Sequence, residues 1–374
     1  MSLTEAIKEK AIELGFDLVG VAPARRSPHA DAYASWVDAG YAASMGYMLR
    51  DVARRQDPRQ VLPGAHSVIV VGLSYFSAAP PDEMWSDPSR GRIARYAWGR
   101  DYHEILTPRL HQLARFIQAE TGREVGHRVV VDTGPVLERD VAAQAGLGFI
   151  GKNTCLINPR LGSYLFLGEI LLCHELDFDE PAADSGARVL IAARPGSQAG
   201  FERYQREQPA RCRVGTCGAC TRCLKACPTQ AFPAPYVLDS NRCISYLTIE
   251  SKDSIPLVLR PLLGNWIFGC DECQSVCPWP RRFAQPNQAN LLRFDPGQAA
   301  PKLLDLISLP EDESRARFRQ TPLWRAKRRG LLRNVAVALG NWGSPLAASA
   351  LQRALHDPEP LIREHAAWAL ERIG

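Results

Sequence analysis

Cysteines are the residues of this chain whose type and spacing point most directly to chemistry. Eight of the eleven form two matching groups, a compact run and a stretched copy, each ending in Cys-Pro: Cys217, Cys220, Cys223 and Cys227, then Cys243, Cys270, Cys273 and Cys277. The spacing C-x2-C-x2-C-x3-C-P is that of bacterial 4Fe–4S sites, because short spacers let three thiolates converge on one cube while the fourth points elsewhere. The chain is therefore predicted to move electrons.

In proteins with two such clusters, the fourth cysteine of a run binds the other cluster. Crossing the fourth members predicts two ligand sets: Cys217, Cys220, Cys223 and Cys277 for one cluster, and Cys227, Cys243, Cys270 and Cys273 for the other. Two zinc sites of four thiolates each would use the same cysteines, although zinc ribbons rarely end in Cys-Pro. The three left over are predicted to be structural thiols: Cys155, Cys173 and Cys212.

The composition is that of a globular chain with several domains. Its 374 residues are 46% hydrophobic, which suffices for two or three cores. No apolar run approaches the roughly 18 residues of a membrane span. Residues 1–15 have the spacing of an amphipathic helix that opens with a Ser2/Glu5 capping box, not that of a signal peptide. Cluster-type cysteine spacing without such a signal predicts a reducing compartment, the cytoplasm.

The net charge of +5 is mild but unevenly placed. Residues 291–374 contain thirteen Lys and Arg against nine Asp and Glu, and most of these basic residues lie between Arg315 and Arg333. Such a run is typical of a phosphate-facing patch. It is equally typical of solvated helix faces paired with acidic neighbours, here Glu311, Asp312 and Glu313.

Hydrophobic periodicity predicts a mixed α+β region followed by helices. Continuous apolar runs predict three strands: 16–22, 67–75 and 128–132. Helical spacing predicts two helices in the same region: 102–119, with Pro108 as a kink or late start and Gly122 as its stop, and 136–145. Three domains are expected: 1–208, 209–290 and 291–374.

The last part of the chain has three helical stretches: 331–339, 347–355 and 360–370. An Asp-Pro-x-Pro turn followed by an Arg- and Ala-rich helix is typical of HEAT repeats, which stack into curved surfaces that bind partners. A plain helical cap on the core is the alternative.

Asp132 stands at the end of an apolar strand, directly before the turn Thr-Gly-Pro135. Such an aspartate either orders its turn or takes part in chemistry. Downstream, residues 145–154 form a glycine-rich loop with Lys152, which would let backbone N–H groups approach a cofactor closely. Asn153 follows the lysine, so the loop is not a P-loop, and it lacks the dinucleotide-binding glycine pattern.

Four stretches, taken in order, carry a resemblance to a known family: VVVDTGPVLERDVAAQAGLGFIGKN, LINPRLGSYLFLGEIL, CISYLTIE and GNWIFGCDECQSVCPWP. Together they resemble the epoxyqueuosine reductases over roughly residues 5–282. That family is cytoplasmic and cobalamin-dependent, acts on epoxyqueuosine at the tRNA wobble position, and is similar to reductive dehalogenases. The resemblance implies a nitroreductase-like cobalamin domain, a ferredoxin-like domain with two 4Fe–4S clusters, and a HEAT-like tail. Pro280 departs from the family's usual C-P-W-N ending, which bears on the local loop and not on the ligands.

The resemblance also implies roles for individual residues. Asp132 matches the family's proposed proton donor. Eight residues are expected to line the corrin or its side chains: Gly151, Lys152, Asn153, Ser163, Ser240, Ser245, Tyr246 and Lys252. The cobalt-binding pattern D-x-H-x-x-G begins at Asp101 and His103, but Leu106 replaces its glycine. We therefore expect base-off cobalamin without a protein histidine ligand.

Converting an epoxide to an alkene takes two electrons and two protons and releases water. Side chains cannot supply electrons, so the corrinoid would carry that step, the clusters would feed it, and an acid would meet the departing oxygen. The implied partners are a tRNA anticodon arm and an external one-electron reductant, with no membrane and a monomeric chain. Basic residues predicted to hold the RNA are Arg281, Arg282, Lys327, Arg328 and Arg329.

Two other functions stay open at this stage. One is a different corrinoid reductase, such as a reductive dehalogenase, although those usually carry a twin-arginine signal and this N-terminus has none. The other is a non-catalytic iron–sulfur electron carrier. Binding of cobalamin would separate that carrier from either enzyme.

Overall fold

The computed structural model describes residues 1–78, 80–181, 190–191, 216–284 and 296–374. Its main element is an antiparallel sheet in the order β4-β7-β2-β1-β8. The strands are β1 (Leu18–Pro23), β2 (Ser67–Ser74), β4 (His127–Val130), β7 (Leu165–Leu172) and β8 (Leu190–Ile191). Both faces of β2 are buried, which is why the strand reads as a continuous apolar run.

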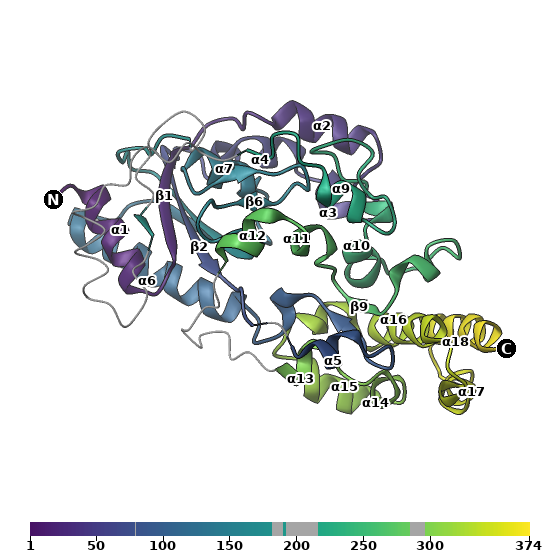
Figure 1. Cartoon of the computed structure of the whole chain (residues 1–374). Coiled ribbons are helices and arrows are strands. Elements are labelled where there is room, and N and C mark those ends of the chain that lie inside the picture. Colours follow the sequence, from purple (N-terminus) through teal and green to yellow (C-terminus); the bar gives the residue numbers. More distant parts are fainter. Residues whose placement is uncertain (79, 182–189, 192–215, 285–295) are drawn as a thin grey trace.

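Helices cover the two faces of this sheet (Figure 1). On one face, α1 (Leu3–Glu13) and α6 (His103–Thr121) contribute side chains such as Ile7, Leu106 and Leu110 to a core with β1 and β2. On the other face, α7 (Glu138–Gln144) packs Val141 and Ala142 against the same strands. The region is therefore a three-layer sandwich whose central layer is the sheet.

The predicted elements of this region are present, but one long strand and several short elements were not predicted. Helix α6 runs through Pro108 without ending there and stops at Gly122, whose φ of +64° closes the helix in the left-handed conformation. The predicted Ser2/Glu5 capping box is formed at the start of α1. Strand β7, between β4 and β2, was not predicted, because Gly168 and Glu169 interrupt its apolar run.

Short helices and strands complete the first two thirds of the chain. They are α2 (Ala30–Asp38), α3 (Gly46–Leu49), α4 (Val52–Gln56), α5 (Asp82–Ser86), α9 (Arg222–Ala226), α10 (Ile244–Ile249), α11 (Glu272–Ser275), α12 (Pro278–Phe283), β3 (Arg92–Ile93), β5 (Phe149–Ile150), β6 (Leu156–Ile157) and β9 (Trp266–Phe268). Within the described residues, no helix combines the length and apolar character that crossing a membrane requires.

The C-terminal region is helical, as predicted. Its helices are α13 (Pro296–Ala299), α14 (Leu303–Ile307), α15 (Glu311–Phe318), α16 (Lys327–Trp342), α17 (Ala348–Ala354) and α18 (Pro360–Ile373). Helices α16 and α18 lie side by side, and α17 packs against α18 (Figure 1).

One hydrophobic core joins all three predicted domains. Strand β3 pairs in parallel with β9, and Trp98, Phe268 and Leu339 belong to the same buried cluster. Both predicted domain boundaries, after residues 208 and 290, lie outside the described residues, and the threefold division stays a prediction.

The predicted basic run ends at Arg333, but this residue does not lie on a charged surface. It is fully buried on α16 and donates hydrogen bonds to the backbone oxygens of Leu247, Ser251 and Asp253. Burial lowers the pKa of Arg333 to about 10. The guanidinium satisfies carbonyl groups of the segment between Cys243 and Cys270, and so ties the helical region to the cysteine-rich region.

Candidate functional site

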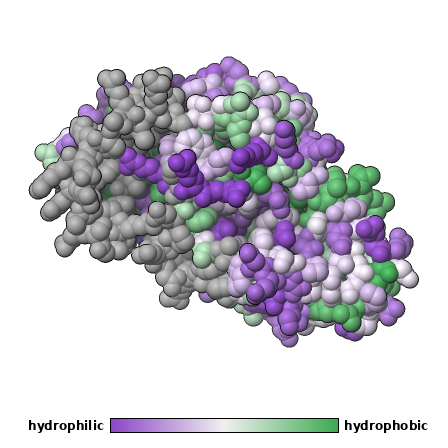
Figure 2. All heavy atoms as spheres, in the orientation of Figure 1, coloured by the Kyte–Doolittle hydropathy of each residue, from purple (hydrophilic) through white to green (hydrophobic). Residues whose placement is uncertain are grey.

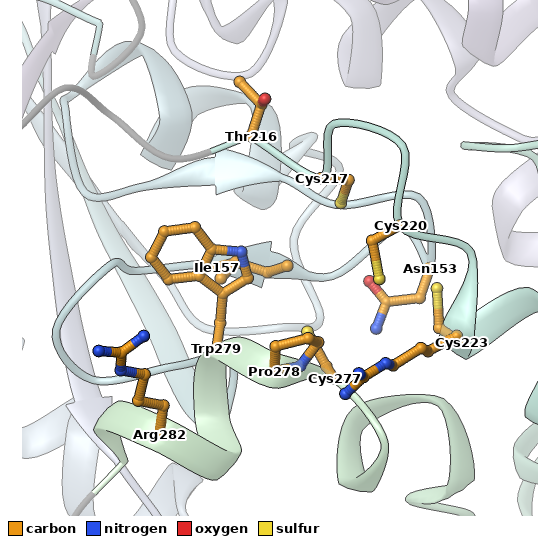
Figure 3. Close-up of a pocket in the computed structure, with 11 residues that line it drawn as sticks. Asn153, Ile157, Thr216, Cys217, Cys220, Cys223, Cys277, Pro278, Trp279 and Arg282 are labelled. Carbon is orange, nitrogen blue, oxygen red and sulfur yellow. The ribbon is translucent and has the colours of Figure 1, made fainter.

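The first predicted ligand set comes together in one cavity. This cavity, of about 330 Å³, is lined by Cys217, Cys220, Cys223 and Cys277, and its walls include Asn153, Ile157, Trp279 and Arg282. Figure 3 shows the cysteine side chains around a common space. Burial, and then the charges of the other three thiolates, raise the pKa of Cys277 to about 11. The long gap in sequence between Cys223 and Cys277 is thus closed by the fold, as the crossed assignment requires.

The second predicted set is also brought together. Burial raises the pKa of the Cys243 thiol, and the charge of Cys227 adds to it. Burial likewise raises the pKa of Cys270, with a contribution from Cys243. The thiol of Cys155, burial, and the charges of Cys270 and Cys243 raise the pKa of Cys273. Both groups of thiols fit a cofactor that binds through thiolates, although within the described residues no three His, Cys, Asp or Glu side chains are arranged to hold a single metal ion.

The three remaining cysteines have different surroundings. Cys155 lies against Cys273, beside the second set. Cys173 contacts the backbone oxygen of Pro63 at 3.6 Å, consistent with the predicted structural thiol. Cys212 lies outside the described residues.

The loop after β5 supports the first set of thiols. Its Lys152 backbone N–H donates to Cys217 Sγ at 3.3 Å, and Lys152 Nζ donates to the backbone oxygens of Gly218 and Cys220 at 2.7 and 3.1 Å. Gly151 allows the tight turn, because a Cβ there would lie 2.5 Å from the Ile157 side chain. The structure therefore places this loop at the cysteines.

The other predicted corrin residues divide between two places. Asn153 and Ser163 lie near the cysteines, where their side chains bond to the Cys273 backbone oxygen (3.5 Å) and to Gln274 Oε1 (2.9 Å). The remaining four lie on the segment around α10: Ser240, Ser245, Tyr246 and Lys252. Their roles toward a corrin stay predictions.

Asp132 is held in a specific geometry at the end of β4. Its φ of +56° is left-handed, a conformation uncommon for a residue other than glycine. Its Oδ2 accepts hydrogen bonds from the Tyr102 hydroxyl and the Arg325 guanidinium, both at 2.8 Å. Arg325 also donates to the Tyr102 oxygen at 2.9 Å. The three polar groups form a closed triangle, and the Asp132 side chain keeps 43% of its surface exposed.

Three distant parts of the chain build this triangle. Tyr102 and His103 stand at the start of α6, Asp132 follows β4, and Arg325 lies in a 3-10 turn at Pro322–Ala326. Tyr102 is kept in place by stacking on Phe166 of β7, with ring centroids 4.3 Å apart. His103 bonds through Nδ1 to Asp101 at 2.7 Å, and its Nε2 lies 3.4 Å from Arg325.

Sequence reasoning missed Arg325 and Tyr102 as members of this site. Burial opposes the charge of Arg325, but its contacts with Tyr102 and Asp132 raise its pKa overall. Burial, then the Asp132 charge, raises the pKa of Tyr102, which keeps it a hydroxyl donor. Arg325 appeared only as one of many basic residues, and no local pattern in the sequence connects it with Asp132.

The predicted RNA-binding residues differ in availability. Arg281 and Arg282 are exposed on α12, and Lys327 is exposed on α16 with its Nζ over the Trp324 ring. Arg329 is exposed but bonds to the Lys252 backbone oxygen at 3.1 Å. Arg328 is engaged inside the helical region, where it donates to the Leu309 backbone oxygen and, through both terminal nitrogens, to Asp357. The face of the molecule drawn in Figure 2 has hydrophilic side chains gathered across its middle.

Comparisons with known proteins agree with this arrangement. Residues 55–133 match the family described as epoxyqueuosine reductase QueG, DUF1730; residues 216–280 match a 4Fe-4S double cluster binding domain; and residues 325–374 match HEAT repeats. The epoxyqueuosine reductase of Pseudomonas aeruginosa is 41% identical over 379 residues, covering 100% of this chain and 95% of its own. That of Xanthomonas campestris is 39% identical, covering 98% and 95%.

Solved structures are similar over the whole chain. An epoxyqueuosine reductase with an epoxyqueuosine-modified tRNA-Tyr stem loop has a TM-score of 0.84 at 30% identity, with 100% of this chain and 90% of that chain covered. The Bacillus subtilis enzyme, in a structure with its catalytic aspartate loop swung out of the active site, has a TM-score of 0.83 at 31% identity and the same coverage. The predicted α+β fold with a two-cluster domain and HEAT-like tail is confirmed, and the chain belongs to the epoxyqueuosine reductase family.

Proposed function

We propose that this chain reduces epoxyqueuosine in tRNA to queuosine, with electrons that pass through two 4Fe–4S clusters to cobalamin. Family membership and the relative solved with a modified tRNA stem loop support the substrate. The observation that carries the proposal is the Asp132 triangle, a half-exposed carboxylate held by Tyr102 and Arg325. Such a carboxyl group is positioned to meet a substrate oxygen and, in its protonated form, to give it a proton.

Asp132 would act as the acid for the departing epoxide oxygen. Tyr102 and Arg325 both donate to Oδ2, which leaves Oδ1 as the oxygen able to face the substrate. Asp132 must be protonated before it can act as the acid. It would hold this proton either while Arg325 is still in contact with it or after that contact has opened. Tyr102 would orient the carboxyl group throughout, because its ring is fixed against Phe166.

Cobalamin would supply the two-electron reduction when bound. The proposed binding of a large, flat ring is supported by α3, where Tyr47 and Leu49 keep 42% and 48% of their surfaces exposed. Arg55 donates to the backbone oxygens of both Tyr47 and Gly134, which connects this exposed surface with the turn after Asp132. Residues proposed to line the corrin are Gly151, Lys152, Asn153, Ser163, Ser240, Ser245, Tyr246 and Lys252. His103 is proposed not to bind cobalt, since its Nε2, the ring nitrogen that Asp101 does not engage, lies 3.4 Å from the Arg325 guanidinium.

The crossed cysteine sets are proposed as the cluster ligands, and the exposed Arg281, Arg282, Lys327 and Arg329 as phosphate contacts. Arg328 is the least available of the predicted RNA contacts, because Asp357 already binds it. We further propose a monomeric chain that works in the cytoplasm, where its tRNA is found, with an external one-electron reductant.

The proposal is tested with an anticodon stem-loop that carries epoxyqueuosine, the protein reconstituted with iron, sulfide and cobalamin, and a chemical reductant. Queuosine is measured by mass spectrometry of released nucleosides. The Asp132→Ala variant should retain both clusters and lose activity by about 10² to 10⁴, the usual share of a general acid. The neighbouring Thr133→Ala variant is the matched control and should stay near the wild-type rate. Near-normal turnover of Asp132→Ala would reduce Asp132 to a residue that orders its turn.

A further inference from the structure

Glu169 is an unexpected residue in the middle of the central sheet. It lies on β7, where it pairs with Val130 on one side and Val70 on the other, and it is 0% exposed. Neither of its carboxyl oxygens has a hydrogen-bond partner among the described residues when both are taken as acceptors. A buried carboxylate without donors is strongly disfavoured, so this side chain needs a physical explanation.

Glu138 supplies that explanation. It is the first residue of α7, which packs against β7, and its charge helps to raise the pKa of Glu169. A second contact connects it with the turn of Asp132, because Glu138 Oε1 accepts the backbone N–H of Asp132 at 2.5 Å. Two ionised carboxylates cannot donate to each other, whereas a protonated one can. A proton held between Glu138 and Glu169 would give the Glu169 carboxyl group the partner that it otherwise lacks.

The electrostatic surroundings keep that proton in place. Burial raises the pKa of Glu138 to about 8, and the Asp132 charge adds to it, while the cations Arg139 and Arg55 act in the opposite direction. Burial also raises the pKa of Glu169, with contributions from Glu138 and Asp132. On the strands beside Glu169, β2 and β4, the paired residues are valines and add no charge.

We propose that Glu138 and Glu169 form a proton-sharing carboxyl pair that positions the Asp132 turn for the reaction. Glu138 uses one oxygen to accept the Asp132 N–H, and the shared proton links the other to Glu169. The pair is a positioning device and not a proton donor to substrate, because its contact is with the backbone of Asp132 and not with its carboxylate. Its importance for catalysis rests on the proposed function of Asp132.

Loss of the shared proton would release the turn. The pair would then carry two negative charges in place of one, beside Asp132 inside the sandwich, where low polarity strengthens their repulsion. The left-handed backbone of Asp132 depends on its surroundings to hold it, so the turn is the part that yields. The pair thereby makes the position of Asp132 sensitive to pH.

The test is hydrogen–deuterium exchange of the Asp132 amide in the full chain with its clusters, without tRNA or cobalamin. Exchange is followed between pH 6 and 9. Each rate is divided by the rate of the β4 amides, which removes the general increase of amide exchange with pH. In the wild-type protein the normalised rate should rise about tenfold or more above about pH 8. Glu138→Gln keeps an acceptor oxygen but cannot ionise, so its rate should stay nearly constant. Glu169→Gln leaves Glu138 as the only carboxyl group of the pair, which then carries at most the single negative charge of the proton-sharing state, so its rate should also stay nearly constant.

The exposed Glu9→Gln variant on α1 is the matched control and should behave as the wild type. Iron content and circular dichroism establish that each variant is folded. Equal and pH-independent normalised exchange in the wild type, Glu138→Gln and Glu169→Gln would overturn the proposal. Since no substrate is present, this result is separate from failure of the proposed reaction, which the stem-loop assay reports.

Discussion

Replacing Arg325 by methionine should slow the reaction without weakening tRNA binding. Arg325 is the group that reaches from the helical region to Asp132, with a 2.8 Å contact to Oδ2 and a 2.9 Å contact to the Tyr102 oxygen. Methionine fills similar space but removes the charge and all donors. Tyr102 keeps its own bond to Asp132, so the carboxyl group would lose one of its two anchors.

The expected size of the effect follows from the geometry. Two unit charges about 4 Å apart attract by about 4 kcal/mol near a protein surface. The side chains are 30% and 43% exposed, so water screens much of this, and a charge-assisted hydrogen bond is worth about 1.5 to 3 kcal/mol. If that amount positions Asp132 in the transition state, kcat should fall by about 10 to 100-fold. Arg325→Lys should be intermediate, because an ammonium group keeps the charge but lacks the planar fork.

The assay is steady-state conversion of the modified stem-loop, with KM and kcat measured separately. Arg319→Met is the matched control, since Arg319 is exposed at the end of α15. A raised KM with unchanged kcat would refute the reasoning, because it would make Arg325 an RNA contact and not an anchor of Asp132. In the Asp132→Asn background, the additional loss caused by Arg325→Met should be much smaller than in the wild type.

Three further predictions concern the clusters, stability and RNA. Cys277→Ala and Cys227→Ala should each lower reconstituted iron from about eight to about four per chain, whereas Cys155→Ala should keep all of it, as iron analysis would show. Burial raises the pKa of Glu138 to about 8, well above the roughly 4.3 of an unfolded glutamate, so the folded chain binds more protons between these values. Thermal stability should accordingly decline as pH rises from about 5 to 8, and decline less in Glu138→Gln; equal slopes in calorimetry would contradict this. Neutralising Arg281 and Arg282 together, or Lys327 and Arg329 together, should reduce the salt dependence of stem-loop binding by up to about two counterions, while Arg328→Ala should instead lower the melting temperature.

Local spacing was sufficient to predict much of the fold. The strands β1, β2 and β4 are short apolar runs, and α16 to α18 have regular helical periodicity, so their own residues encode them. The cysteine sets are predictions of the same local kind, because spacing along the chain limits which thiolates can share a cluster. The structure groups Cys277 with Cys217, Cys220 and Cys223, which are distant from it in sequence, in agreement with that assignment.

Strand β7 is an element that local spacing does not predict. Its buried Glu169 breaks the apolar pattern that identifies an internal strand, and only the neighbouring Glu138 makes that glutamate tolerable. Since the two residues are far apart in sequence and both are acidic, no local rule predicts that they share a site. The basic residues of the tail show the same limit. Nothing in the local sequence distinguishes Arg328 and Arg333 from Lys327, but the two arginine side chains are hydrogen-bonded inside the protein.

The order of the residues is enough to identify the groups that can do chemistry here: thiolates spaced for clusters, and a carboxylate at a strand end. Their surroundings, in contrast, depend on how the whole chain packs. Arg325 lies 193 residues from Asp132, and the two meet because the helical region packs against the segments that carry β3 and β9. Spacing constrains groups that are close along the chain, whereas contacts between distant residues arise from the packing of whole elements, which burial of their apolar faces brings about.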